Sequence, residues 1–283
     1  MFMVKQMFMV KRLVVGLCAL ALVSATAGTV SAATIQEPCP SGNARCVKTT
    51  IKQMDVRFQP LAAACSHQAV FSLAYLRTTE EYARAAAEPG FFINVRFVNR
   101  EDALFAAYYF DAFDAWAGGS AGVPEAWQIA FNAADRRRVA GSGNLLLGMN
   151  AHVNRDLPFV LAQLGLGRKA DHDKVNTFLQ RVVEPLLAEE SARFDPTMDD
   201  FETPFGLSYT ALFEILKGWR EQAWQNAKLL VNAPTPAARA LVAAQIEAYA
   251  ASTARSLVAT YAYANNPTLT GAAARDAYCA THG

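Results

Sequence analysis

The sequence predicts an all-α fold. We expect about seven helices in a single bundle-like domain that is stapled by disulfides and follows a cleaved signal peptide. Alanine is abundant and recurs at helical spacing, whereas no long stretch alternates Val, Ile or Thr with polar residues. Four cysteines remain after the leader, and an even number in an exported chain is typical of disulfides. The leader itself has the basic, apolar and small-residue order of a signal peptide.

Residues 1–33 form this leader. Its basic residues are Lys5, Lys11 and Arg12. An apolar run over 13–23 follows, and small residues continue to Ala32 and Ala33, near which we expect cleavage. The run has about half of the ~20 residues that a membrane-spanning helix needs. We therefore expect export to the periplasm or out of the cell, with no transmembrane segment in the mature chain.

Composition excludes several classes of protein. Hydrophobic residues make up 53% of the chain and charged residues 18%, which is too apolar for a disordered protein. The formal net charge is +1, and loss of the three basic leader residues changes it to −2. A nearly neutral chain gives no electrostatic reason to expect nucleic acid as a partner. The oligomeric state is left open.

The cysteines outside the leader are Cys39, Cys46, Cys65 and Cys279. Four cysteines allow three pairings, of which we favour Cys39–Cys46 and Cys65–Cys279. The first would close a short loop, and the second would tie the C-terminal tail to the first long helix. Finger-like cysteine and histidine spacing is absent from the sequence, which argues against zinc.

The predicted helices follow the three-and-four spacing of apolar residues. In chain order they cover 67–88, 101–117 with Asn99 as N-cap, a segment opened by Pro124, 145–166, a segment beginning at Asp171, 206–231 and 236–264. Residues 91–98 are expected to be an extended connection or hairpin edge, because one strand makes no sheet. Residues 194–204 are expected to be an acidic connection, with a lid as the alternative.

The predicted domain boundaries follow from these segments. We expect the signal peptide over 1–33 and an extended or loop segment with Cys39 and Cys46 over 34–66. The helical domain would cover 67–266, and a tail with Cys279 would cover 267–283.

One helix carries an unusual polar cluster. Residues 144–161 are apolar almost all round, which is typical of a central helix. The cluster consists of Asn150, His152, Asn154, Arg155 and Asp156. Burying such groups without partners costs about 1–3 kcal/mol each, so we expect partners or a cavity. Pro158 cannot donate to the carbonyl of Asn154, which predicts a kink here.

His152 and Asp156 lie one turn apart on one face, so the carboxylate can orient the imidazole as a general acid or base. The candidate catalytic residues are His152, Asp156 and Asn150. The candidate binding residues are Asn154, Asp111, Tyr108 and Tyr75. In the alternative interpretation the same polar groups form a buried structural network, with Asp156 as a helix cap.

A metal site would need more ligands than this pair supplies. We expect no cofactor, with a divalent metal as the alternative, held with help from Asp111, Glu80 or the acidic residues 199–202. The chain has no G-x-S-x-G elbow, phosphate-binding loop or H-E-x-x-H motif.

The segment GMNAHVNRDLP, residues 148–158, resembles the GMNAHINHDLP-like signature of a bacterial family known as a domain of unknown function. The YYFDAF segment, Pro124 with Trp127, and the segment 219–224 are also similar to that family. Arg155 stands where the family has a second histidine, which weakens a two-histidine metal site. The resemblance implies where a site lies and implies no activity.

Three hypotheses follow. The first is an exported acid–base enzyme, either a hydrolase or a proton-transfer enzyme, that acts on a small apolar molecule through His152 and Asp156. The second is an exported ligand-binding or structural protein without catalysis. The third is a divalent-metal hydrolase that resembles the all-helical phospholipase C type.

Overall fold

The computed structural model describes residues 34–199, 206–265 and 271–283, and it confirms the all-α prediction. The helices are α1 (Ala44–Ala63), α2 (Ala69–Ala87), α3 (Val95–Ala117), α4 (Glu125–Asp135), α5 (Gly141–Met149), η1 (Asn150–Asp156), α6 (Leu157–Leu164), α7 (Lys169–Arg193), α8 (Tyr209–Val231), α9 (Pro236–Tyr261), η2 (Tyr263–Asn265) and α10 (Ala272–His282). Within the described ranges, β-structure is limited to one bridge between Val139 and Ala262. The predicted signal peptide lies outside the described residues.

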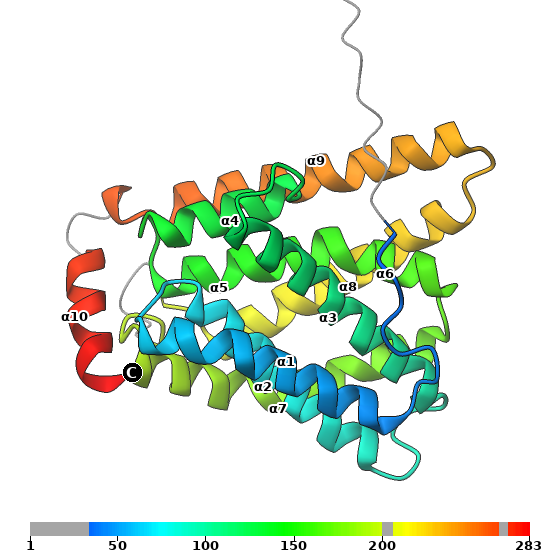
Figure 1. Cartoon of the computed structure of the whole chain (residues 1–283), viewed down its shortest axis with the longest axis horizontal. Helices are drawn as coiled ribbons and strands as arrows, with labels where there is room; N and C mark the ends of the chain where they lie inside the picture. Colours follow the sequence, from blue (N-terminus) through cyan, green and yellow to red (C-terminus); the bar gives the residue numbers. More distant parts are fainter. Residues whose placement is uncertain (1–33, 200–205, 266–270) are drawn as a thin grey trace, which may run out of the picture.

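A nearly continuous helix made of α5, η1 and α6 runs through the middle of the molecule (Figure 1). The long helix α9 crosses one side of it, while α1, α2 and α7 cover the other. Helix α5 packs on α2, α4 and α9, and η1 packs on α3, α4, α8 and α9. The polar cluster of the sequence is therefore placed at the centre, where helices from both halves of the chain meet.

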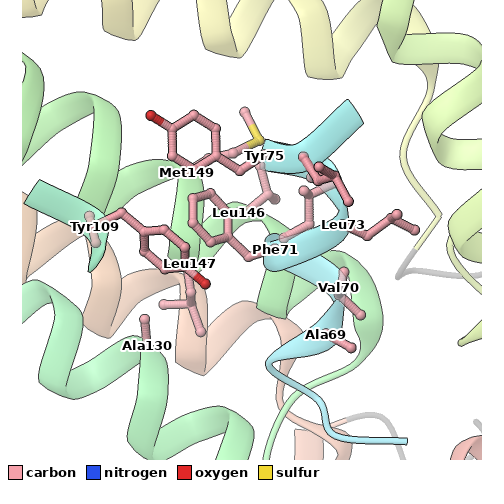
Figure 2. Close-up of a cluster of buried hydrophobic side chains, with 14 of the residues drawn as sticks. Ala69, Val70, Phe71, Leu73, Tyr75, Tyr109, Ala130, Leu146, Leu147 and Met149 are labelled. Carbon is pink, nitrogen blue, oxygen red and sulfur yellow. The ribbon is translucent and has the colours of Figure 1, made fainter. Parts of the chain in front are cut away.

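The core beside this central helix is aromatic and aliphatic (Figure 2). Phe71 and Tyr75 of α2 pack against Leu146 and Met149 of α5. The approach of α2 to α5 depends on Gly148, because a Cβ built there would lie 2.2 Å from the Phe71 ring. The glycine thus sets how closely the aromatic side chains of α2 reach η1.

Two predicted non-helical segments are helical. The expected loop over 34–66 contains α1, and the expected tail over 267–283 contains α10, so both predictions are wrong for these parts. In α1, a stripe of residues at three-and-four spacing is buried: Val47, Thr50, Met54, Phe58 and Ala62. The many polar residues between them conceal the stripe. In α10, burial of Arg275 and Cys279 stabilises a short helix.

Helix α3 begins earlier than predicted. Its N-cap is Asn94, whose side chain accepts from the Phe97 N–H, so the predictions of Asn99 as N-cap and of an extended segment up to residue 98 are wrong. The carboxylate of Asp171 accepts the backbone N–H groups of Ile93 and Asn94, at 2.6 and 2.9 Å. This contact from α7 fixes the start of α3, and a partner so distant in sequence leaves no local pattern.

Both favoured disulfides are present. Cys39 pairs with Cys46 at a Cα–Cα distance of 5.9 Å, and Cys65 pairs with Cys279 at 5.8 Å. The second bridge joins the turn between α1 and α2 to α10. In the parts of the chain that the structure describes, no helix combines the length with the apolarity required to span a bilayer.

Candidate functional site

The polar cluster forms a π-helix, η1, within the central helix. The N–H of Leu157 donates to the carbonyl of His152, five residues back, where an α-helix would use the carbonyl of Val153. Pro158 supplies the reason, because it has no N–H for the carbonyl of Asn154. The predicted irregularity is therefore a widened turn, and such turns frequently accompany functional sites.

Three donors converge on the buried carboxylate of Asp156. The indole N–H of Trp127 donates to Oδ2 at 2.9 Å, Nδ1 of His152 lies 3.0 Å from the same oxygen, and Nη1 of Arg155 lies 2.9 Å from Oδ1. The carboxylate accepts from the indole and guanidinium, which can only donate. We therefore assign the imidazole proton to Nδ1, which leaves Nε2 of His152 as an acceptor. Arg155 is held in turn by Glu247 of α9, at 2.9 Å.

Aromatic rings enclose the imidazole of His152. The Phe105 ring stacks on it with centroids 3.5 Å apart and planes 5° apart, and the Tyr75 ring lies 4.4 Å away. Among the described residues, Nε2 is buried and has no hydrogen-bond partner. Burial lowers the pKa of His152, and the hydrogen bond and charge of Asp156 oppose this only in part. At neutral pH the imidazole is therefore uncharged, with a free lone pair on Nε2.

His152 lines an apolar cavity of about 120 Å³ between α2, α3, α5, η1, α7 and α8. Tyr75 and Phe105 also line it, whereas Asp156 lies behind the imidazole and is not part of the wall. The hydroxyl of Tyr75 is buried, and within the described parts of the chain it has no hydrogen-bond partner. Two residues of the mainly apolar lining, His152 and Tyr75, therefore each carry a buried polar atom without a hydrogen-bond partner among the described residues.

Ionisable side chains line the same cavity from α3 and α8. Burial raises the pKa of Asp102 well above its ordinary value, and the charge of Glu101 adds to this shift. Burial also raises the pKa of Glu101 to about 7, although Arg220 of α8 opposes it. The Arg220 guanidinium is buried, and desolvation lowers its pKa to about 10. Burial therefore favours the protonated form of Asp102, which can donate a hydrogen bond.

The structure separates the remaining predicted site residues from the cavity. The amide of Asn150 donates to the Ala250 carbonyl of α9 at 2.8 Å, which links η1 to α9, and its oxygen accepts from Asn154 of the same helix at 2.9 Å. Tyr108 bonds Gln163 at 3.2 Å and is not part of the cavity wall. Asp111, a predicted binding residue, is exposed on α3 and is not part of the cavity wall. Tyr75 is the predicted binding residue that lies beside His152.

The predicted metal ligands do not come together. Within the described ranges, no group of three or more His, Cys, Asp or Glu side chains is arranged to hold a metal ion. Glu80 instead forms an ion pair with Arg77 at 2.9 Å. Of the acidic residues 199–202, only 199 is described, and the rest lie outside the described residues.

Sequence reasoning missed four residues of the site. Trp127, Phe105, Asp102 and Arg220 were not among the candidate catalytic or binding residues. A signal existed for Asp102, since it stands one helical turn before Phe105 in a helix that is otherwise apolar there. No local signal existed for Trp127, because its role depends on α4 lying beside η1.

Comparison with known proteins identifies the family. No curated protein and no solved structure matches the chain. The model of the family described as "Family of unknown function (DUF5995)" matches residues 47–260. The match runs from α1 to the end of α9 and includes every residue of the Asp156 cluster and the cavity wall. The chain therefore belongs to the DUF5995 family of unknown function.

Proposed function

We propose that this protein is an exported acid–base enzyme that acts on a small apolar molecule bound in the central cavity. One observation carries the proposal: Nδ1 of His152 is held by a buried carboxylate, while Nε2 is buried without a hydrogen-bond partner among the described residues and the His152 side chain lines the cavity. In a purely structural network we would expect hydrogen bonds to both ring nitrogens, because a buried acceptor without a hydrogen bond lowers the free energy of unfolding by about 1–3 kcal/mol.

The proposed chemistry uses one nitrogen twice. Nε2 of His152 takes a proton from a water molecule or from a carbon beside a substrate carbonyl. Asp156 stabilises the imidazolium that results, and Tyr75 donates a hydrogen bond to the substrate oxygen. Nε2 then returns the proton to the leaving oxygen or to the rearranged substrate. The two possible reactions are hydrolysis and isomerisation, and both require His152 together with Asp156.

Proton exchange tests the proposal without knowledge of the natural substrate. Purified protein in deuterated buffer should exchange the protons beside the carbonyl of small apolar ketones, followed by NMR, or should cleave small apolar esters. We expect His152→Gln to reduce either rate by about a hundredfold to ten-thousandfold, with a melting temperature within a few degrees of wild type.

His67→Gln is the matched control, because His67 is also buried, bonds Asp276 at 3.1 Å and lies outside this cavity. It should keep the full rate. Exchange and cleavage that persist in His152→Gln, or that are absent from the wild type, would overturn the proposed chemistry.

A second candidate is a ligand-binding protein without catalysis. Phe105 covers one face of the imidazole and Asp156 is not part of the cavity wall, which is the arrangement expected of a passive apolar pocket. In that case calorimetry would detect apolar ligands that wild type and His152→Gln bind alike, with no turnover of any of them.

The exported location is part of the proposal. Two disulfides support it, because such bonds persist in oxidising compartments. The leader pattern of residues 1–33 supports it independently. Mass spectrometry of protein recovered after expression in a bacterial host should show that these residues have been removed, and an intact leader would contradict export.

A further inference from the structure

The cavity is long in one direction. On α2 it is lined at three-and-four spacing by Phe71, Ala74, Tyr75, Thr78, Thr79 and Tyr82. On α7 its lining runs with the same spacing from Val175 to Leu186. Each stretch advances by eleven residues, which is about 16 Å of helix. Both helices therefore line the cavity over three full turns.

The two helices run antiparallel along it. The Tyr82 ring of α2 lies 5.7 Å from the Phe178 ring of α7, while Arg77 of α2 bonds Glu189 of α7 at 2.7 Å. Residue numbers thus rise on one wall as they fall on the other, so the two linings run in opposite directions past each other. A cavity of about 120 Å³ that extends so far is a narrow slot.

A narrow slot selects molecules by shape. An engineered apolar cavity of about 150 Å³ accommodates benzene, but that cavity is compact. Here a smaller volume is spread over three helical turns, so the slot is too narrow for a ring. An extended aliphatic chain would contact both walls throughout, and each buried methylene would strengthen binding.

Tyr75 and His152 lie side by side in the wall of the slot, with ring centroids 4.4 Å apart. Asp102 is one helical turn from Phe105, which stacks on His152. Tyr75 can donate a hydrogen bond and Nε2 of His152 can accept one. This pair suits an uncharged oxygen function, because the Arg220 guanidinium that also lines the slot already donates to Asn176 and to the His172 carbonyl, and a ligand carboxylate would be desolvated beside Asp102 and Glu101.

We propose that the slot binds a linear aliphatic chain with an uncharged oxygen function, such as an alcohol, ketone or ester, held between Tyr75 and His152. The role of the ligand oxygen as part of the reacting group rests on the proposed function. The preference for a linear chain follows from the shape of the slot alone.

A chain-length series tests it. Linear alcohols from butanol to hexadecanol would be titrated into the full chain with its disulfides intact, and binding followed by calorimetry. We expect each added methylene to tighten binding about fourfold until the slot is filled, after which affinity should stop rising. Decanol should bind at least about tenfold more tightly than adamantanol and decanoate. Equal affinity for linear and cage alcohols, or no binding, would overturn the proposal.

Variants locate the ligand. Ala74→Phe fills the slot between Phe71 and Thr78, and should abolish decanol binding. Ala126→Leu is the control, because Ala126 is equally buried but lies in α4 outside the slot. It should bind decanol as wild type does. If Ala74→Phe fails to fold, Ala74→Val should still shorten the chain length at which affinity stops rising. Unchanged binding in a folded Ala74→Phe variant would overturn the assignment of the site.

The two proposals fail in different ways. If linear alcohols bind as expected but His152→Gln leaves every reaction unchanged, the slot is correct and the acid–base function is wrong. If cage ketones exchange protons as fast as linear ones and bind as tightly, the acid–base function holds and the inference about chain shape fails.

Discussion

Asp156 is a buried carboxylate whose hydrogen-bonding capacity is used by side chains of three kinds. Indole, imidazole and guanidinium groups all point their hydrogens at it. Charge-assisted hydrogen bonds of this kind are roughly twice as strong as neutral ones, and they offset the cost of removing the charge from water. The arrangement fixes both the ring orientation and the tautomer of His152, which local sequence alone could not do.

Glu101 makes stability depend on pH. Its pKa is raised to about 7 in the folded protein by burial, so the folded state keeps a proton that the unfolded state has released. The Glu101 contribution to stability therefore falls as pH rises from about 4.5 to about 7, by roughly 3 kcal/mol in all. We expect Glu101→Gln to match wild type near about pH 4 and to exceed it by roughly 3 kcal/mol near about pH 8, in urea denaturation.

Glu214→Gln provides the comparison, because Glu214 is an exposed residue of α8 that pairs with Lys217. It should change stability by less than about 0.5 kcal/mol at both pH values. A Glu101→Gln variant that tracks wild type across the whole pH range would show that Glu101 ionises normally in the folded protein.

Among the helices, α5–η1–α6 shows most clearly how far sequence reasoning reaches. The run of polar residues and Pro158 predicted an irregular, central helix, and both features are present. Pro158 accounts for the break in α-helical bonding, but the length of the π-helix could not be predicted, because Trp127, Ala250 and Glu247 from other helices also hold η1. The start of α3 was predicted wrongly for the same reason, because it is fixed by Asp171 from another helix.

Pro158 keeps the π-helix open, and its replacement should close it. Pro158→Ala restores an N–H that can reach the Asn154 carbonyl, so the segment gains a normal α-helical bond. We expect an unchanged or higher melting temperature together with a loss of proton exchange of at least about tenfold, because His152 and Asp156 would shift relative to each other.

Pro185→Ala is the corresponding change in the interior of α7, away from the Asp156 cluster. It should alter melting temperature in the same direction without a loss of rate. Full proton-exchange activity in Pro158→Ala would indicate that the widened turn has no part in the function.

The whole molecule is held by two disulfides of very different reach. They span sequence separations of 7 and 214 residues. In the chain-entropy model, removing the long bridge should cost about 5 kcal/mol and removing the short one about 2 kcal/mol. Urea denaturation of Cys65→Ala/Cys279→Ala and of Cys39→Ala/Cys46→Ala measures the difference. Equal losses would mean that unfolded-chain entropy does not dominate at these bridges.

For the whole molecule, the sequence predicted a contact within one helix but did not predict the cavity that several helices form together. The pairing of His152 with Asp156 was readable from their spacing, because both lie in one helix. The cavity was not readable, because its walls come from six helices spread over the chain. The prediction of Asp111 as a binding residue failed for a local reason. Its helix is apolar on several faces, so the sequence did not reveal which face is exposed to solvent.

The long bridge also sets an order of events. Cys39 and Cys46 can meet as soon as the first helix is made, whereas Cys65 must stay a thiol until the final helix arrives. During that interval Cys65 can attack the bridge already closed, and thiolate exchange would leave Cys39 or Cys46 free in its place. Correct oxidation of this chain is thus a matter of timing, and the cell that makes it benefits from an isomerase near the place of folding.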